Sequence, residues 1–168
     1  MAVLPIQVFP TRVLKQRAKR VKYIDGPVKK LVRDMLETMH AVPGRVGLAA
    51  PQVGVPLRVI VIGIPEEEED IVLINPEIVR RKGERVIDEG CLSLPGFFAN
   101  ITRSEVVTVK GLDQNGKEVR IKAEGLLAQA LEHEIDHLNG TLYIDHLDSI
   151  EKLQKVEPME TGPEDDGG

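Results

Sequence analysis

The sequence has a single cysteine, no tryptophan, and few other aromatic residues, which make up 3% of its 168 residues. One cysteine cannot form a disulfide within the chain, so nothing indicates an oxidising compartment, and we expect a reducing cytoplasm. The scarcity of aromatic rings leaves few surfaces on which single-stranded nucleic acid or a sugar could stack. The sequence therefore disfavours both a disulfide-rich secreted protein and a binder of single-stranded nucleic acid.

Long apolar runs and an excess of positive charge are also missing. No run approaches the roughly 20 residues that a membrane-spanning helix needs, and the first ten residues do not match a signal peptide. The net charge is −5, from 22 basic and 27 acidic residues. We therefore expect neither secretion nor membrane insertion, and no specific binding of DNA.

The composition that is present, 42% hydrophobic and 29% charged, is typical of a folded globular chain. The length suits one domain, and we expect a single catalytic domain over residues 1–150. Residues 151–168 form a C-terminal extension rich in acidic residues, proline and glycine. Because this extension has little apolar content, we expect it to be mostly disordered.

Hydrophobic periodicity predicts two helices and several short strands. Apolar residues recur at helical spacing over residues 26–40, and a second helix is expected from about residue 124 to the Asn139-Gly140 pair. Apolar stretches predict strands at 57–62, 71–74, 77–80, 85–88, 106–109, 118–121 and 141–144. The predicted fold class is α+β, with mostly antiparallel strands packed around a central C-terminal helix and a further helix near the N-terminus.

The later helix carries the motif His133-Glu134-Ile135-Asp136-His137, an H-E-x-x-H pattern. Residues four apart lie on one face of a helix, so the two imidazoles can converge on a single metal ion. Glu134 lies on the neighbouring stripe, within reach of a water held by that ion. Chance would produce about 0.01 such matches in a chain of this composition. We therefore expect the later helix to bind a metal.

A catalytic metal site needs a third protein ligand. The distant candidates are Cys91, His40, His146 and many carboxylates. A thiolate binds late first-row metals well, and Gly90 frees the backbone for a close approach. The neighbouring Glu89 needs a cation such as Arg103. These observations favour Cys91 without excluding the other candidates.

A third segment, Gly47–Gln52 (GLAAPQ), combines small residues with an amide side chain. Together with Glu89–Ser93 (EGCLS) and His133–Leu138 (HEIDHL), in this order and at these distances, it resembles the three motifs of the peptide deformylases. The resemblance covers the chain from its start to about residue 150. It implies hydrolysis of the formyl group from the N-terminal formylmethionine of new proteins, with release of formate.

The resemblance also implies the roles of individual residues. Cys91, His133 and His137 hold the metal, which in the family is ferrous iron, although zinc, nickel or cobalt suit the same ligands. Glu134 moves protons, whereas the Gln52 amide and the Leu92 N–H stabilise the charge that develops on the formyl oxygen. The residues expected to bind or surround the substrate are Val46, Gly47, Ile87, Glu89, Gly90, Leu126, Gln129 and Ala130.

Three positions depart from the family pattern. Arg45 stands where the first motif normally has glycine, so it could narrow or charge the substrate groove. Glu132 stands where glutamine is common, and Phe98 where several relatives have a basic residue. These differences affect the expected peptide preference and turnover, not the class of reaction.

Two other functions are also compatible with parts of this pattern. A zinc endopeptidase shares the H-E-x-x-H motif but takes its third ligand downstream, where His146 and several acids are the candidates. A ribosome-associated binding module could keep the fold without turnover, although the presence of Glu134 and Gln52 argues against it. The expected partners are formylmethionyl nascent peptides. Nine basic residues within 1–33 also suggest transient proximity to the ribosome.

Overall fold

The first long helix, α1 (Gly26–His40), forms where the sequence predicts it. A computed structural model describes residues 2–65 and 67–156. The Asp25 side chain accepts a hydrogen bond from the Val28 N–H at 3.2 Å and so caps the helix, and Pro27 stands in the first turn. One face of α1 is buried through Val32 and Met35. The helix therefore packs as an amphipathic element, as expected.

The main sheet has five strands in the order β1-β2-β3-β6-β7, and each neighbouring pair is antiparallel. Its strands are β1 (Gly47–Ala49), β2 (Val59–Ile62), β3 (Ile71–Lys82), β6 (Val106–Leu112) and β7 (Glu118–Glu124). The predicted turn at residues 113–116 joins β6 to β7. Beside the short strand β1 lies a 3-10 helix, η2 (Ala50–Val53).

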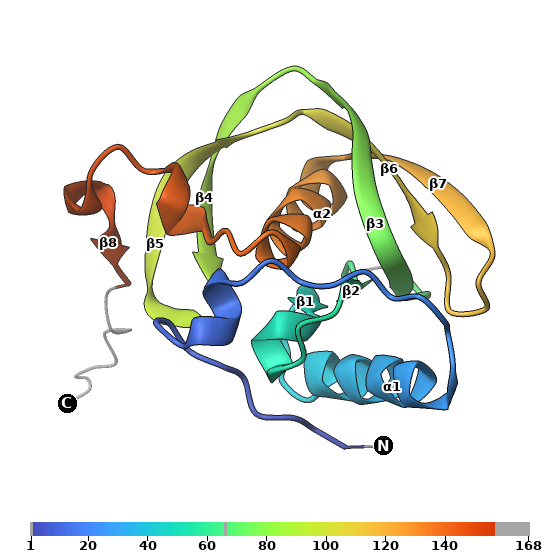
Figure 1. Ribbon diagram of the computed structural model, residues 1–168. Coiled ribbons are helices and arrows are strands. Elements are labelled where there is room, and N and C mark those ends of the chain that lie inside the picture. Colours follow the sequence, from blue (N-terminus) through green and yellow to red (C-terminus); the bar gives the residue numbers. More distant parts are fainter. Residues whose placement is uncertain (1, 66, 157–168) are drawn as a thin grey trace.

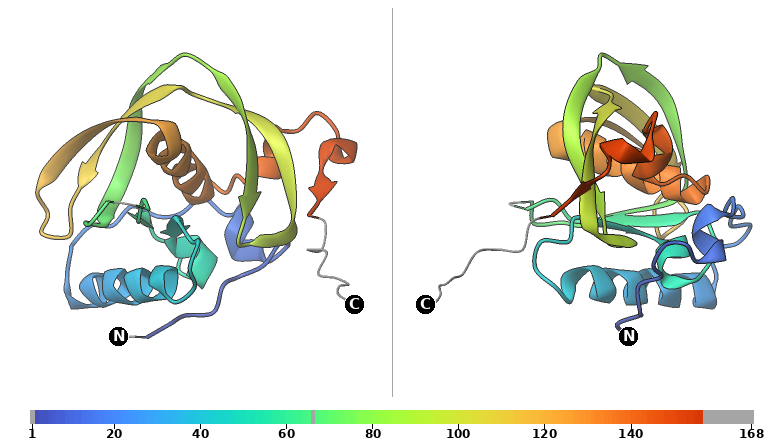
Figure 2. Two further views of the ribbon diagram at one scale, coloured as in Figure 1. Left: turned by 180° about the vertical axis from the view of Figure 1, so that it is seen from behind. Right: turned by 90° about the vertical axis from the view of Figure 1, so that its left-hand side faces the viewer.

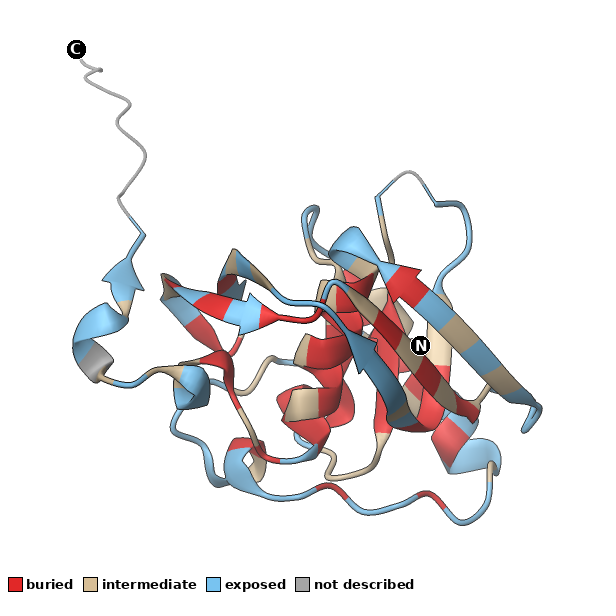
Figure 3. Cartoon of the chain, turned by 90° about the horizontal axis from the view of Figure 1, so that it is seen from above, coloured by how far each residue is buried: buried red, intermediate tan, exposed pale blue. Residues whose placement is uncertain are grey.

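A second sheet contains β4 (Arg85–Cys91), β5 (Leu94–Arg103) and the two-residue strand β8 (Gln154–Lys155). The long strands β3 and β4 arch over the helix α2 (Gly125–Leu138), which lies between the two sheets (Figure 1). Most of α2 is buried in this central position (Figure 3). The expected α+β fold with a central C-terminal helix is confirmed.

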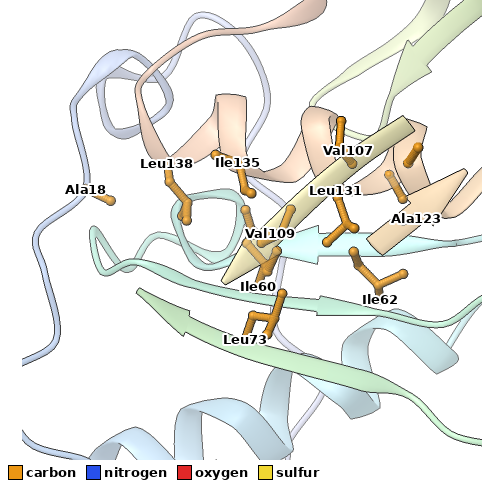
Figure 4. Close-up of a cluster of buried hydrophobic side chains, with 13 residues drawn as sticks. Ala18, Ile60, Ile62, Leu73, Val107, Val109, Ala123, Leu131, Ile135 and Leu138 are labelled. Atoms are coloured by element: carbon orange, nitrogen blue, oxygen red, sulfur yellow. The ribbon is translucent and has the colours of Figure 1, made fainter. Parts of the chain in front are cut away.

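Two hydrophobic clusters fix α2 and α1 on opposite faces of the main sheet. On strand β2, Ile60 and Ile62 face α2, whereas Val59 and Val61 face α1. This follows from the alternation of side chains along a strand. Figure 4 shows the α2-facing cluster, and Figure 2 shows from the side how α1 and α2 lie on either side of β1 and β2. This packing fixes the position of α2 relative to β1.

Several elements differ from the sequence predictions, and the short strands β1 and β8 are among those not predicted. Residues 71–82 form one strand with bulges, because Asn75 takes a positive φ of 54° and its side chain pairs with both backbone groups of Val21. The strand β5 was not predicted, since Pro95 and Gly96 interrupt its apolar pattern. The prediction of a strand at 141–144 is wrong, because a 3-10 helix, η3 (Tyr143–His146), forms there instead.

The start of the C-terminal extension has regular structure. A short 3-10 helix, η4 (Ile150–Lys152), leads into β8, which pairs with Phe97 and Phe98 of β5. Residues 157–168, on which most of the predicted disorder falls, lie outside the described residues. Among the described residues, no helix combines the length and apolar character required to cross a bilayer.

Candidate active site

The side chains of Cys91, His133 and His137 converge at the end of β4 and on one face of α2. The His137 Nε2 atom lies 3.2 Å from the Cys91 Sγ and 3.2 Å from the His133 Nε2. One ligand atom from each residue falls within 4.8 Å of the others. A thiolate and two imidazoles suit a late first-row metal, and three protein ligands are the usual number at a catalytic site. The residues therefore fit a metal ion.

The two histidines differ in their proton affinity. Burial lowers the pKa of His133, but the neighbouring Glu134, Cys91 and Glu89 outweigh this effect and raise it well above the ordinary value. Burial and the charge on His133 lower the pKa of His137 well below that value. A metal takes the neutral form of each imidazole, so metal binding must displace the proton from His133.

A buried network behind the site orients His133. Glu89 contacts the His133 Nδ1 and accepts two hydrogen bonds from Arg103, at 3.0 Å from Nε and 2.5 Å from Nη2. Arg103 also donates to Asp136 at 2.8 Å, and Asp136 lies 2.9 Å from the His146 Nε2. The expected pairing of Glu89 with Arg103 is confirmed. The parts played by Asp136 and His146 were not predicted, because neither residue type nor spacing distinguished them from surface residues.

Loss of Arg103 should strongly destabilise the fold. Arg103 and Glu89 are each 4% exposed, so Arg103→Met removes the buried guanidinium that pairs with two carboxylates, Glu89 and Asp136. Removing one partner of such a buried pair lowers the free energy of unfolding by about 3–5 kcal/mol. Urea unfolding measures the effect, with Lys110→Met in the exposed pair with Glu77 as the control, expected to cost less than about 1 kcal/mol. Equal effects of the two substitutions would contradict the prediction.

Stability at low pH should depend on Glu89. Burial raises the pKa of its carboxyl, but hydrogen bonds from His133 and Arg103 outweigh it and hold the folded-state pKa at about 2, below the ordinary 4.5. Ionised Glu89 therefore stabilises the fold fully above pH 4.5, and this contribution, about 3 kcal/mol, disappears as the pH falls from 4.5 to 2.

Urea unfolding at a series of pH values tests this dependence in the metal-free protein. Glu89→Gln should be less stable than the wild type at neutral pH, and its stability should decline less steeply between pH 4.5 and 2. Asp88→Asn changes the exposed neighbour on β4 and serves as the control. An unchanged slope in the Glu89→Gln variant would refute the assignment.

Glu134 lies beside the three ligands and is 5% exposed. Burial raises the pKa of its carboxyl to about 7, and the negative charges of Glu89 and Asp136 add to the effect. Its Oε1 atom has no hydrogen-bond partner among the described residues. A Cβ atom added to Gly47 would lie 2.8 Å from the Oε2 atom, so a larger residue there would displace this carboxylate. Glu134 is thus free to bind water or substrate and can exchange a proton near neutral pH.

Gln52 approaches the same point from η2. Its Oε1 accepts a hydrogen bond from the Ala49 N–H at 2.9 Å, which turns the Nε2 towards Ser93 Oγ at 3.3 Å and Cys91 Sγ at 3.6 Å. Leu92 lies between these two residues of the second motif. The side-chain amide and the backbone around Leu92 can therefore donate to an oxygen held near the metal ligands.

A cavity of about 400 Å³ opens over these groups. All the residues expected to bind substrate line it except Ile87, which packs against the cluster around Leu94 and Tyr143. The expectation for Ile87 is therefore not supported, because Ile87 lies farther along β4 and the cavity reaches this strand only from Glu89 onward. The full lining is Gly44, Arg45, Val46, Gly47, Gln52, Glu89, Gly90, Cys91, Leu92, Leu126, Gln129, Ala130, His133 and Glu134.

The family model described as Polypeptide deformylase matches residues 3–153, which include every residue of this site. The chain belongs to the peptide deformylase family. A peptide deformylase of Dehalococcoides mccartyi (strain CBDB1) is 52% identical over 165 residues, covering 98% of each chain. One from Thermodesulfovibrio yellowstonii is 52% identical over 155 residues, covering 90% of this chain and 93% of the relative.

Solved structures of the peptide deformylase family share the fold. The crystal structure of a peptide deformylase from Legionella pneumophila superposes with a TM-score of 0.86 at 47% identity, covering 90% of this chain and 89% of that one. The Synechococcus elongatus enzyme in complex with actinonin gives 0.84 at 43% identity, covering 90% and 82%. Family membership disfavours the endopeptidase alternative, and Cys91, upstream of the helix motif, supplies the third candidate ligand.

Proposed function

We propose that this chain hydrolyses the formamide bond of N-terminal formylmethionine, releasing formate and a free amine. The observation that carries the proposal is that the buried Glu134 carboxylate, whose Oε1 has no hydrogen-bond partner among the described residues, lines one cavity with Cys91 and His133, the ligands that converge with His137. Membership of the peptide deformylase family supports the same reaction.

Cys91, His133 and His137 would hold the metal, and we propose ferrous iron, with zinc, nickel and cobalt as substitutes that suit the same donors. When bound, such an ion is a Lewis acid that lowers the pKa of water and polarises a carbonyl group. In this role Glu89 accepts a hydrogen bond from the His133 Nδ1 and so orients the His133 Nε2 towards the other two ligands.

Glu134 is proposed to act as the general base and then as the general acid. Its carboxylate takes a proton from the attacking water as the new C–O bond forms at the formyl carbon. The same proton then passes to the amine nitrogen as the C–N bond breaks. A pKa of about 7 suits both transfers, because the group can accept and return a proton near neutral pH.

Gln52 and Leu92 are proposed to stabilise the transition state. The formyl oxygen gains negative charge when water attacks, and the Gln52 Nε2 amide and the Leu92 N–H donate hydrogen bonds to it. The bond from the Ala49 N–H fixes the Gln52 amide before substrate arrives, so little reorganisation is needed. This arrangement is preorganised for charge that develops only during the reaction.

The methionine side chain is proposed to lie against the apolar part of the cavity, formed by Val46, Leu126 and Ala130. The peptide backbone would run along β1, which has β2 as its single strand partner among the described residues. Backbone groups on its other edge are placed to pair with an extended peptide.

We also propose that the protein acts in the cytoplasm on nascent chains close to the ribosome. Exposed basic residues follow one another in the segment before α1, including Arg17, Lys19 and Arg20. Such a segment attracts the phosphates of ribosomal RNA through interactions that weaken with salt.

The decisive experiment measures formate release from a formyl-Met-Ala-Ser peptide by protein loaded with ferrous iron without air. The proposal expects formate and no cleavage of internal peptide bonds. Internal cleavage without formate would support an endopeptidase. A metal-loaded protein that releases no formate and cleaves no peptide bond would overturn the proposal in favour of a binding module.

A further inference from the structure

The loop between α1 and β1 brings a cation into the wall of the cavity. Arg45 lines the cavity together with Val46 of the same loop and Gly47, the first residue of β1. The other charged lining residues have partners or roles at the reacting centre, since Glu89 pairs with Arg103 and Glu134 is the base. Among the described residues, Arg45 has no acidic partner in an ion pair.

The Arg45 side chain is anchored, yet most of its donors are unused. Its Nη1 donates to the Thr38 carbonyl in the last turn of α1 at 2.6 Å. Its Nε is buried and has no hydrogen-bond partner among the described residues. A guanidinium has five N–H donors, so one hydrogen bond holds the group in place and leaves others for a second ligand. An anchored cation loses less side-chain freedom when it binds than a free surface arginine does.

The position of Arg45 relative to Glu134 indicates which part of a substrate it meets. Gly47 lies directly over the Glu134 carboxylate, and Arg45 is two residues farther from that point along the chain. Two extended residues span about 6–7 Å. In the pose proposed above, a peptide with its formyl group at Glu134 and its methionine against Leu126 that runs along β1 towards this loop carries its next residues past Arg45.

We propose that Arg45 is a specificity-determining residue that favours substrates with an acidic side chain at the second or third position. This inference rests on the proposed function, because it assigns a direction to the peptide in the same cavity. The attraction arises between the guanidinium and a carboxylate in a partly enclosed groove, where ion pairs are screened less than on an open surface. The ligand recognised is thus an acidic formyl-Met peptide.

The test compares kcat/KM for formyl-Met-Ala-Glu, formyl-Met-Ala-Gln and formyl-Met-Ala-Lys, and for the three peptides with the variable residue at position two. The wild type should prefer glutamate over lysine in at least one series by roughly 3- to 10-fold, and high salt should reduce this ratio. Arg45→Gln should bring the ratio close to one, whereas Arg45→Lys should keep its direction. Arg33→Gln on the exposed face of α1 removes the same charge elsewhere and should leave the ratio at the wild-type value.

The neutral glutamine peptides separate this inference from the proposed function. Absence of formate from them would reject the function itself, whereas turnover without charge preference in the wild type would reject the role of Arg45 alone. If Arg45 serves only to hold the end of α1 through Thr38, Arg45→Gln will slow all peptides equally, and that result overturns the inference. If Arg45→Gln fails to fold, the inference is still tested by the wild-type ratio of kcat/KM for glutamate and lysine peptides, by its salt dependence, and by the same ratio for Arg45→Lys.

Discussion

The Glu134→Gln variant is expected to release formate from a formyl-Met peptide about 10²- to 10⁴-fold more slowly than the wild type, with its metal content unchanged. Glutamine preserves the size of the side chain in a tight site, where a Cβ at Gly47 would already approach the Oε2 atom to 2.8 Å. It cannot accept the proton of the attacking water. Formate release and metal analysis of the same preparation measure the two quantities together.

The control for this experiment is Glu118→Gln, which makes the same change at an exposed position of strand β7. It should keep both activity and metal. Near-normal turnover by Glu134→Gln would remove Glu134 from the proton transfers. Loss of the metal from that variant would instead place Glu134 among the groups that hold the ion.

The second large effect is expected from Cys91→Ala, which should weaken metal binding by more than about 100-fold and abolish formate release. Losing even an outer partner of a metal ligand costs about 10- to 100-fold in affinity, so the loss of a ligand itself should cost more. In this variant the Nε2 atoms of His133 and His137 still lie 3.2 Å apart on α2, but the thiolate that completes the three metal ligands is missing. Equilibrium titration with ferrous iron or zinc in the absence of air measures the change.

Cys91→Ser separates the thiolate from the space it fills, because serine offers a harder and less readily ionised ligand of similar size. We expect its affinity to lie between those of the wild type and Cys91→Ala. Circular dichroism confirms that each variant is folded. Full metal content and activity in Cys91→Ala would show that the third ligand lies elsewhere.

Much of the fold could be predicted from local sequence patterns. The helices α1 and α2 were predictable because their apolar residues recur at helical spacing and because Pro27 and the Asn139-Gly140 pair mark ends. The strand β5 was not, since Pro95 and Gly96 stand near its start, beside a register shift in its pairing with β4, and such a shift depends on the tertiary arrangement. Likewise, β3 continues through Asn75 because Val21, distant in sequence, pairs with its side chain.

The site residues likewise fall into two groups, those that local spacing predicts and those that only the tertiary fold brings together. His133, Glu134 and His137 could be found from spacing within one helix, whereas Cys91 could only be favoured from its chemistry until the motifs were considered together. The link from Arg103 to Asp136 depends on the tertiary fold, which brings the end of β5 to α2, and no local pattern encodes it. The exclusion of Ile87 from the cavity likewise depends on where β4 meets the helix.

The short strand β8 has a consequence for the behaviour of the protein at high concentration. It pairs with β5 at Phe97 and Phe98, on the edge of the smaller sheet. An uncovered edge beside two aromatic side chains is a template on which a second molecule can add a strand. By occupying these positions, the chain's own Gln154 and Lys155 protect this part of the edge against aggregation.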